Sequence, residues 1–466
     1  MSLAADSCEG FGSLDRQTSV PALKGLPLLG LAPALRRDPL RFFTRVAAEH
    51  GGAVWLHLGP DRVLMLNDPA MIRHVLQDNR TNYVKSRFYD MMRPVLGEGI
   101  FLAEGEDWLG QRKTALRSFQ GCQLRRMTAA MQDAVDDMVL RWQGPAARGA
   151  ALDVVPEMMR LTLDILMRTL FSVRLDGEHE EVFHAMTLVL RDAERRIWSP
   201  LQMPRWLPTR RKRAVAQALA TLDRFVYGMI AERRAASADA TDGQSTGDAD
   251  LLDLLLAAQG EGTDRRLRDQ VLSMILAGHE TTANALAWCW YLLSLHPESL
   301  RRVQAEAESL PAGRPPAFAE LSALAYTRCV FDEALRLYPP LWTFSRTAVD
   351  GDEIAGLPVE AGTNVMLNMF AVHRRPELWD NPEGFDPARF DPETGDPRRR
   401  FAYFPFSDGP RSCLGERFAV LESLVAIATV ARRFDLQLLP GQAVKPEPMI
   451  TLRPQGLKMR LVARAA

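Results

Sequence analysis

The sequence is poor in cysteine. Its 466 residues include five, all far apart and none in a C-x-x-C pair: Cys8, Cys122, Cys289, Cys329 and Cys413. A small, odd and scattered set argues against a disulfide framework, which secreted proteins form in oxidising surroundings. We therefore expect a protein of a reducing compartment, that is, a cytoplasmic one.

Other common features are missing as well. The formal net charge is −1, so composition gives no reason to expect nucleic acid or an anionic membrane as a partner. Residues 1–20 carry four charged side chains and no long apolar run, and we expect a tail without signal peptide or membrane anchor. The 8 histidines show no H-E-x-x-H or similar metal-binding spacing.

What the sequence does contain is one distinctive loop, residues 406–415, with the sequence FSDGPRSCLG. Glycine and proline stiffen it, and it leads directly into a helix with a broad apolar face. That face comprises Phe418, Ala419, Leu421, Leu424, Val425, Ile427 and Ala428. A lone cysteine before a helix is usually structural. Here five specified residues stand at fixed spacing, which argues for a functional loop: Phe406, Gly409, Arg411, Cys413 and Gly415.

The loop has the chemistry to hold a thiolate. Cys413 stands at a helix N-terminus, where free N–H groups favour negative charge, and Arg411 adds a cation. Both features predict a lowered thiol pKa. Gly409 and Gly415 have no Cβ, so a flat, bulky group can approach the backbone. A thiolate held against such a group is the protein ligand of a haem iron.

The pattern F-x-x-G-x-R-x-C-x-G resembles the haem-binding loop of the cytochrome P-450 monooxygenases. The resemblance extends from Pro21 to the end of the chain, with four motifs in the family's order. It implies a mainly α fold with a small β-rich lobe, a triangular prism with a long central helix over the haem. It also implies a single domain over 21–466, haem b as cofactor and Cys413 as its metal ligand.

The longest helical pattern, Leu267–Leu295, is apolar nearly all round and predicts a central helix. Its middle reads Ala277-Gly278-His279-Glu280-Thr281-Thr282, where glycine, threonine and a carboxylate are poor choices for a buried helix. We predict that the Thr281 hydroxyl bonds the Ala277 carbonyl and opens a groove. The sequence A-G-x-E-T-T resembles the family's oxygen-binding motif. We accordingly predict that Glu280 and Thr281 relay protons, a simple helix kink being the alternative.

Further residues are implied to contact the cofactor. Trp108 and Arg112 lie one turn apart, which is equally typical of a plain surface helix, but in the family this pair contacts a haem propionate. Because a propionate favours bidentate arginine, we expect Arg112, Arg346 and Arg411 to bind propionates. Ala277 and Gly278 are expected beside the haem.

A structural ion network is also predicted. Glu333 and Arg336 are spaced i, i+3 in a helix over 326–338, so they can pair. The resemblance supplies Arg389 as the third member of this E-x-x-R network, which would hold the haem-loop region in place.

Elsewhere, patterns predict a helix over 39–50, a hairpin over 54–58 and 62–66, strands around 354–358 and 363–368 joined by a turn, and a closing hairpin over 449–452 and 457–461. Residues 236–250 are small, polar and acidic and predict a flexible surface loop. Four apolar segments are candidates for the lining of a pocket: residues 89–101, 182–206, 341–344 and 449–452. For 182–206 the two alternatives are a mobile lid over the pocket and packed surface helices.

These features predict a monooxygenase that hydroxylates or epoxidises a lipophilic terpenoid, fatty acid or polyketide-like molecule. No flavin, nicotinamide or iron–sulfur motif is present, so electrons must come from a ferredoxin or flavodoxin with its reductase. The basic run 398–400 is the expected docking site, and we expect a monomer. The alternatives are a peroxide-driven peroxygenase, a hydroperoxide isomerase, or a haem-binding sensor without catalysis.

Overall fold

The computed structural model describes residues 20–464 except 27, 60, 176–178, 198–208, 240–248, 260–262, 312–315 and 394–401. The predicted tail and the basic run 398–400 therefore lie outside the described residues, apart from residue 20 of the tail. The chain divides into two compact units. The first comprises residues 1–88, 342–384 and 397–412, and the second comprises residues 89–341, 385–396 and 413–466. That they form a single domain stays a prediction.

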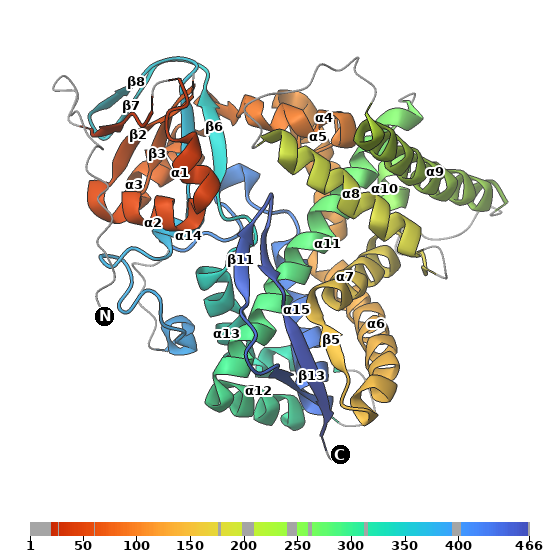
Figure 1. The fold of residues 1–466 in the computed structure, drawn as a ribbon. Coiled ribbons are helices and arrows are strands. Elements are labelled where there is room, and N and C mark those ends of the chain that lie inside the picture. Colours follow the sequence, from red (N-terminus) through yellow and green to blue (C-terminus); the bar gives the residue numbers. More distant parts are fainter. Residues whose placement is uncertain are drawn as a thin grey trace. The chain divides into compact units, whose positions relative to one another are not determined.

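The first unit contains a six-stranded sheet (Figure 1). In spatial order its strands are β1 (Ala22–Leu23), β2 (Ala53–Leu58), β3 (Asp61–Leu66), β9 (Asn364–Leu367), β6 (Phe344–Ala348) and β4 (Tyr83–Lys85). Strands β2 and β3 form the predicted antiparallel hairpin, with Leu58 opposite Asp61. Branched and aromatic side chains favour this pairing because they pack well on a pleated surface.

Strand partners elsewhere in this unit differ from the prediction. Residues 352–359 form a small hairpin of their own, β7 (Asp352–Ile354) and β8 (Leu357–Val359). Strand β9 instead pairs with β3 in parallel and with β6 in antiparallel fashion. The two predicted strands are thus not partners, because β9 joins the larger sheet.

Short helices complete the first unit: α1 (Ala32–Arg37), α2 (Pro39–His50), α3 (Pro69–Arg73) and α14 (Met369–Val372). Helix α2 has the predicted bounds. It begins with proline in its first turn, and the Asp38 carboxylate accepts a hydrogen bond from the Arg41 N–H at 3.0 Å. A π-helical turn, His74–Asp78, follows α3.

The second unit holds most of the helices (Figure 1). They are α4 (Arg93–Leu96), α5 (Gly105–Leu116), α6 (Gly121–Ala147), α7 (Val154–Leu170), α8 (His179–Ile197), α9 (Arg210–Asp239), α10 (Leu251–Gln259), α11 (Asp264–Leu295), α12 (Pro297–Ser309), α13 (Ala325–Leu337) and α15 (Glu416–Arg433). Together with the sheets they confirm the predicted mainly α class with a small β-rich part. None of the described helices is long and apolar enough to cross a membrane.

Helix α11 is the central helix of this unit. It packs against α7 and also contacts α9, α13 and α15. Its side chains are buried nearly all round, as the apolar pattern predicts.

Residues 236–239 extend α9 rather than beginning the predicted loop, and 240–248 lie outside the described residues.

The C-terminal strands also pair differently from the prediction. Strand β11 (Lys445–Pro448) pairs with β12 (Leu452–Gln455), and residues 449–451 form the turn between them. Strand β13 (Lys458–Ala463) pairs instead with β10 (Phe434–Leu438) and β5 (Ala151–Asp153). The prediction that 449–452 and 457–461 form one hairpin is therefore wrong.

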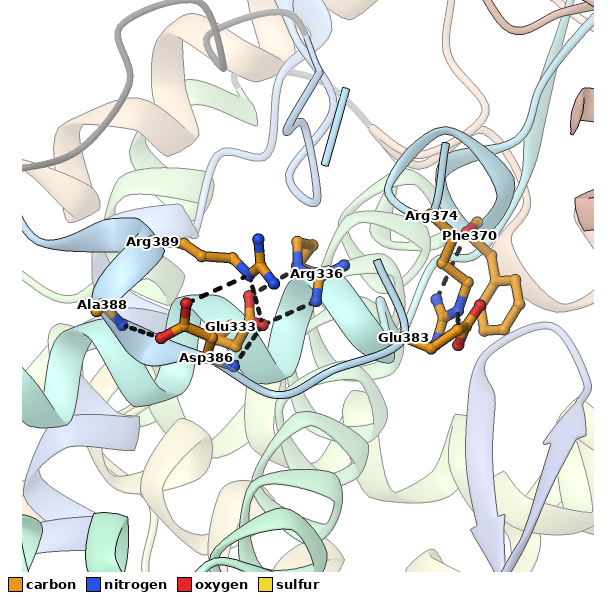
Figure 2. A network of polar contacts seen from close by, with 8 residues as sticks. All are labelled: Glu333, Arg336, Phe370, Arg374, Glu383, Asp386, Ala388 and Arg389. Atoms are coloured by element: carbon orange, nitrogen blue, oxygen red, sulfur yellow. Dashed lines mark hydrogen bonds and ion pairs between the residues drawn. The ribbon is translucent and has the colours of Figure 1, made fainter. Parts of the chain in front are cut away.

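The predicted ion network is present within the second unit (Figure 2). Arg336 donates to both carboxylate oxygens of Glu333, each at 2.7 Å. Arg389 Nε lies 3.4 Å from Glu333 Oε1, which also accepts a hydrogen bond from the Asp386 N–H at 2.9 Å. Glu333 and Arg336 are completely buried. The network therefore ties α13 to the segment around Arg389.

Figure 2 also shows a cluster of the first unit. The Arg374 guanidinium lies 3.6 Å from the Phe370 ring centre, and Arg374 donates to Glu383 at 3.2 Å. This cluster fixes the turn that follows α14.

Candidate active site

Cys413 lies three residues before α15 begins, as predicted. The residue is exposed, although many protein atoms surround its sulfur. This desolvation raises the pKa of the thiol to about 11; the Gly415 N–H bonds the sulfur and acts in the opposite sense. Glu416 raises the pKa further and Arg112 lowers it. The prediction of a lowered pKa is therefore wrong for the protein alone, because desolvation outweighs the local cations and dipoles.

The loop before the cysteine needs glycine at one position. Gly409 has a φ of +72°, and a Cβ there would lie 2.1 Å from the Leu76 carbonyl oxygen. Only glycine fits such a backbone. The residue begins a 3₁₀ turn, Gly409–Arg411, whose first N–H is capped by the Asp408 carboxylate at 2.6 Å. Phe406 is half-buried just upstream.

Trp108 and Arg112 lie on α5 and contact each other. The Arg112 guanidinium lies 5.7 Å from the Trp108 ring centre, and both residues are half-buried. Burial lowers the pKa of Arg112, whereas the Cys413 thiolate raises it, so the two groups interact electrostatically. The structure thus places a cation within range of the sulfur.

Arg346 lies on β6 in the first unit and is buried. Its guanidinium lies 5.0 Å from the Phe344 ring centre and donates to the Ser345 carbonyl at 3.1 Å. Arg346 and Arg411 belong to the first unit and Arg112 to the second. Their shared contact with propionates stays a prediction.

One face of α11 is accessible although the helix is otherwise buried. Between residues 267 and 290, every residue that is not buried falls at i, i+4, i+7, i+8 or i+11: Gln270, Met274, Ala277, Gly278 and Thr281. Such spacing marks a single stripe. On this stripe the Thr281 hydroxyl donates to the Ala277 carbonyl at 2.8 Å, which confirms that predicted hydrogen bond. The helix nevertheless continues unbroken through the position.

Gly278 has a packing role of its own. A Cβ there would lie 2.4 Å from Leu166 Cδ1 of α7. The glycine therefore lets α11 approach α7 closely, and its predicted place beside the haem remains untested.

Glu280 lies next to Thr281 but on the buried side. The Thr451 hydroxyl donates to Glu280 Oε1 at 2.9 Å. Burial raises the pKa of this carboxyl; Thr451, Arg453 and Arg191 act in the opposite sense. Neighbouring His279 is also buried, and burial lowers its pKa to about 4, so it is neutral near pH 7.

Glu280 also lines a small pocket that is partly open to solvent. The other lining residues are Met159, Thr187, Leu190, Arg191, His279, Met449, Ile450 and Arg453. The pocket brings together two of the four segments expected to line one, 182–206 and 449–452.

Sequence reasoning missed two polar residues of this region. Thr451 and Asn284 hydrogen-bond each other at 3.0 Å, but neither belongs to a motif. Glu422 of α15 was missed too, although a carboxylate within that helix's apolar pattern was a usable indication. It is buried beside Thr282, and burial raises its pKa well above the usual range.

The donor set fits a haem-thiolate centre. An accessible thiol accepts the Gly415 N–H, and Arg112 lies within electrostatic range of the sulfur. A coordinated metal ion favours the thiolate over the thiol. The raised thiol pKa of the protein alone is therefore compatible with ligation.

Comparison with known proteins decides the family. A model of the family described as cytochrome P-450 matches residues 20–461. The chain belongs to the cytochrome P-450 family. The family implies a haem-thiolate cofactor, redox partners and a lipophilic substrate, as predicted.

The relatives of this cytochrome P-450 include named monooxygenases. It is 36% identical over 430 residues to cyclooctat-9-en-7-ol 5-monooxygenase of Streptomyces melanosporofaciens, covering 91% of each chain. It is 33% identical over 451 residues to cyclooctatin synthase of the same organism, covering 95% of each chain. Pentalenene oxygenase of Streptomyces avermitilis is 32% identical over 445 residues, which cover 94% of this chain and 96% of the relative. The protein is a cytochrome P-450 monooxygenase.

Proposed function

We propose that this monooxygenase inserts one oxygen atom from dioxygen into a terpenoid, by hydroxylation or epoxidation, with haem b as its cofactor. The observation that carries the proposal is the arrangement on α11. Thr281 lies on the accessible stripe, and the adjacent Glu280 keeps its carboxyl among buried groups. An acid and an alcohol thereby occupy consecutive positions at the centre of the helix, the acid on its buried side and the alcohol on its accessible stripe.

Cys413 would be the iron's protein ligand. Arg112, Trp108, Arg346 and Arg411 would hold the propionates, and Phe406, Gly409, Gly415, Ala277 and Gly278 would lie against the ring. The bound group supplies the iron at which dioxygen is reduced. Arginine suits the propionates because its planar fork matches a carboxylate.

Glu280 and Thr281 would move protons. The raised pKa of Glu280 keeps more of this carboxyl protonated near neutral pH than an ordinary glutamic acid. The Thr281 proton is held by the Ala277 carbonyl, which leaves the hydroxyl oxygen free to accept a hydrogen bond. Thr281 therefore offers a hydrogen-bond acceptor on the accessible stripe, one residue along the helix from Glu280.

Two relatives support a terpenoid substrate, because their names refer to cyclooctat-9-en-7-ol and pentalenene. Apolar side chains of the pocket also favour a lipophilic molecule: Met159, Leu190, Met449 and Ile450. Electrons would come from a ferredoxin or flavodoxin and its NAD(P)H-dependent reductase, and the enzyme would act as a monomer.

The first test is the visible spectrum of the dithionite-reduced protein with carbon monoxide. We expect a strongly red-shifted Soret band in the wild type and its loss in Cys413→Ser. Cys122→Ser is the matched control, because Cys122 is the other exposed cysteine among the described residues. A red-shifted band that survives in Cys413→Ser would contradict the assigned ligand.

The second test is turnover of pentalenene and cyclooctat-9-en-7-ol with ferredoxin, reductase, NADPH and isotopically labelled dioxygen. We expect a product carrying one labelled oxygen atom. Product formation with hydrogen peroxide alone, and none with NADPH, would instead indicate a peroxygenase.

A further inference from the structure

The turn between β11 and β12 is hydrogen-bonded to one face of α11. Three α11 side chains take part, and they are spaced i, i+4 and i+8: Glu280, Asn284 and Trp288. Asn284 Nδ2 donates to Thr451 Oγ1 at 3.0 Å, and Trp288 Nε1 donates to the Leu452 carbonyl at 3.0 Å. Thr451 in turn donates to Glu280 at 2.9 Å. This spacing lines the three side chains up along the helix.

The hydrogen bonds have a fixed direction. A threonine hydroxyl has one proton, and Thr451 gives it to Glu280 Oε1 while its oxygen accepts from Asn284. All three side chains are buried. An unmade hydrogen bond is costly in such a place, so the chain Asn284–Thr451–Glu280 holds the carboxyl in one orientation.

The other groups that face Glu280 are less directly placed. Arg191 of α8 and Arg453 of β12 act on the carboxyl through their charges, and His279 of α11 lines the same pocket. Arg191 is exposed and Arg453 is half-buried, so water screens both charges. Thr451 is therefore the group best placed to orient this acid.

The same turn also lines the pocket. Met449 and Ile450, which immediately precede Thr451, lie beside Glu280 in its lining. A ligand that contacts Met449 or Ile450 would therefore contact the same turn that holds the Glu280 carboxyl.

We propose that Thr451 is a positioning residue that aims the Glu280 carboxyl for proton delivery and couples it to contacts at the Met449–Ile450 turn. The proposal rests on the proton-relay role of Glu280 given above. It concerns no contact with the haem, so it can be tested by a property of the carboxyl itself.

The test uses the ferric holoenzyme and an infrared pH titration of buried carboxyl groups. Subtracting the spectrum of Glu280→Gln identifies the absorption of Glu280, and Glu422→Gln identifies that of Glu422, another buried acid whose pKa is raised by burial. Because Thr451 donates to the charged form of Glu280, we expect Thr451→Val to raise the pKa of Glu280 further. Thr451→Ser keeps the donor and should restore the wild-type value.

Thr128→Val is the matched control. Thr128 is as buried as Thr451, at 4% exposure, but its hydroxyl donates within its own helix to the Leu124 carbonyl. It therefore reports the general effect of removing a buried hydroxyl group. We expect it to leave the Glu280 titration unchanged.

A turnover assay completes the test, with pentalenene as the probe and a ferredoxin, its reductase and NADPH. Product formed per NADPH should fall roughly five- to tenfold in Thr451→Val, with a matching rise in hydrogen peroxide, and recover in Thr451→Ser. An unchanged Glu280 titration in Thr451→Val would overturn the inference. If Glu280→Gln itself turned over normally, the relay role would fail instead, and the titration would still show whether Thr451 orients the carboxyl.

Discussion

Two buried glutamates of the second unit have opposite surroundings. Glu333 accepts two hydrogen bonds from Arg336, lies 3.4 Å from Arg389 and has no exposed surface. Glu280 is nearly as buried, but its hydrogen-bond partner is a neutral hydroxyl. Glu333 is paired with two arginines, whereas Glu280 is hydrogen-bonded to an uncharged side chain.

The difference in surroundings suits Glu333 to a structural role and Glu280 to a role in proton transfer. A carboxylate between two buried arginines holds the fold together, because removing one member of a buried ion pair is costly. A carboxyl whose pKa is raised by burial is instead protonated more readily than an ordinary glutamic acid. The contrast predicts which substitutions damage the fold and which damage turnover.

The largest effect is expected for Glu333→Gln. This change removes the Glu333 carboxylate from beside the buried Arg336 and Arg389, which should lower the free energy of unfolding by about 3–5 kcal/mol. Urea unfolding of the purified protein measures it, and haem content should fall in parallel. A loss below about 1 kcal/mol would show that the network is dispensable.

Glu280→Gln should show the reverse pattern. The amide has the same size and can still accept the Thr451 hydrogen bond, so the free energy of unfolding should change by less than about 1 kcal/mol. Product formation should fall by roughly a hundredfold, because an amide cannot carry the proton. Parallel unfolding and turnover assays check this, and a stability loss as large as that of Glu333→Gln would erase the distinction.

A third buried acid, Glu422, allows the effect of a raised carboxyl pKa on stability to be measured. Burial raises the pKa of Glu422 well above its usual range, while the Thr282 hydroxyl lowers it. Between the unfolded and the folded pKa, the folded protein binds more protons, so this residue makes stability fall as pH rises. Glu422→Gln removes that slope. The free energy of unfolding of Glu422→Gln, relative to that of the wild type, should therefore increase by about 1.4 kcal/mol per pH unit. This increase begins near the unfolded pKa of 4.5 and ends at the folded pKa.

Urea unfolding at a series of pH values measures this slope. A stability difference that stays constant with pH would mean that Glu422 is already ionised in the folded protein.

The smallest effect is expected at an exposed pair. Glu377 is 57% exposed and lies 3.2 Å from Arg375 Nε. Because water screens the pair, Glu377→Gln should change the free energy of unfolding by less than about 0.5 kcal/mol. Measured under the same conditions, it serves as the control for Glu333→Gln.

Local sequence patterns predicted much of this molecule. The helix over 39–50, the β2–β3 hairpin, the hydrogen bond from Thr281 to Ala277 and the Glu333–Arg336 pair all depend on residues close in sequence. Periodicity and spacing capture such contacts. Arg389, which is distant in sequence, was placed by the family resemblance rather than by spacing.

Features that depend on distant partners were not predictable in this way. The pairing of β9 with β3 and of β13 with β10 joins segments far apart in the chain, and alternation within a strand does not name its neighbour. The predicted direction of the Cys413 thiol pKa is wrong because the protein atoms around the sulfur, which a sequence does not display, desolvate it and outweigh the helix terminus. Thr451 was missed because its partner Glu280 lies 171 positions away in the sequence.

Thr451 and Glu280 are 171 positions apart in the chain. Contacts of such long range form late, because a large loop must close before they can stabilise the structure. Helix α11 can therefore be complete while Glu280 still faces water and carries its charge. The acid acquires its raised pKa only when the surrounding protein, the β11–β12 turn included, has packed around it, so proton-relay competence requires the completed fold.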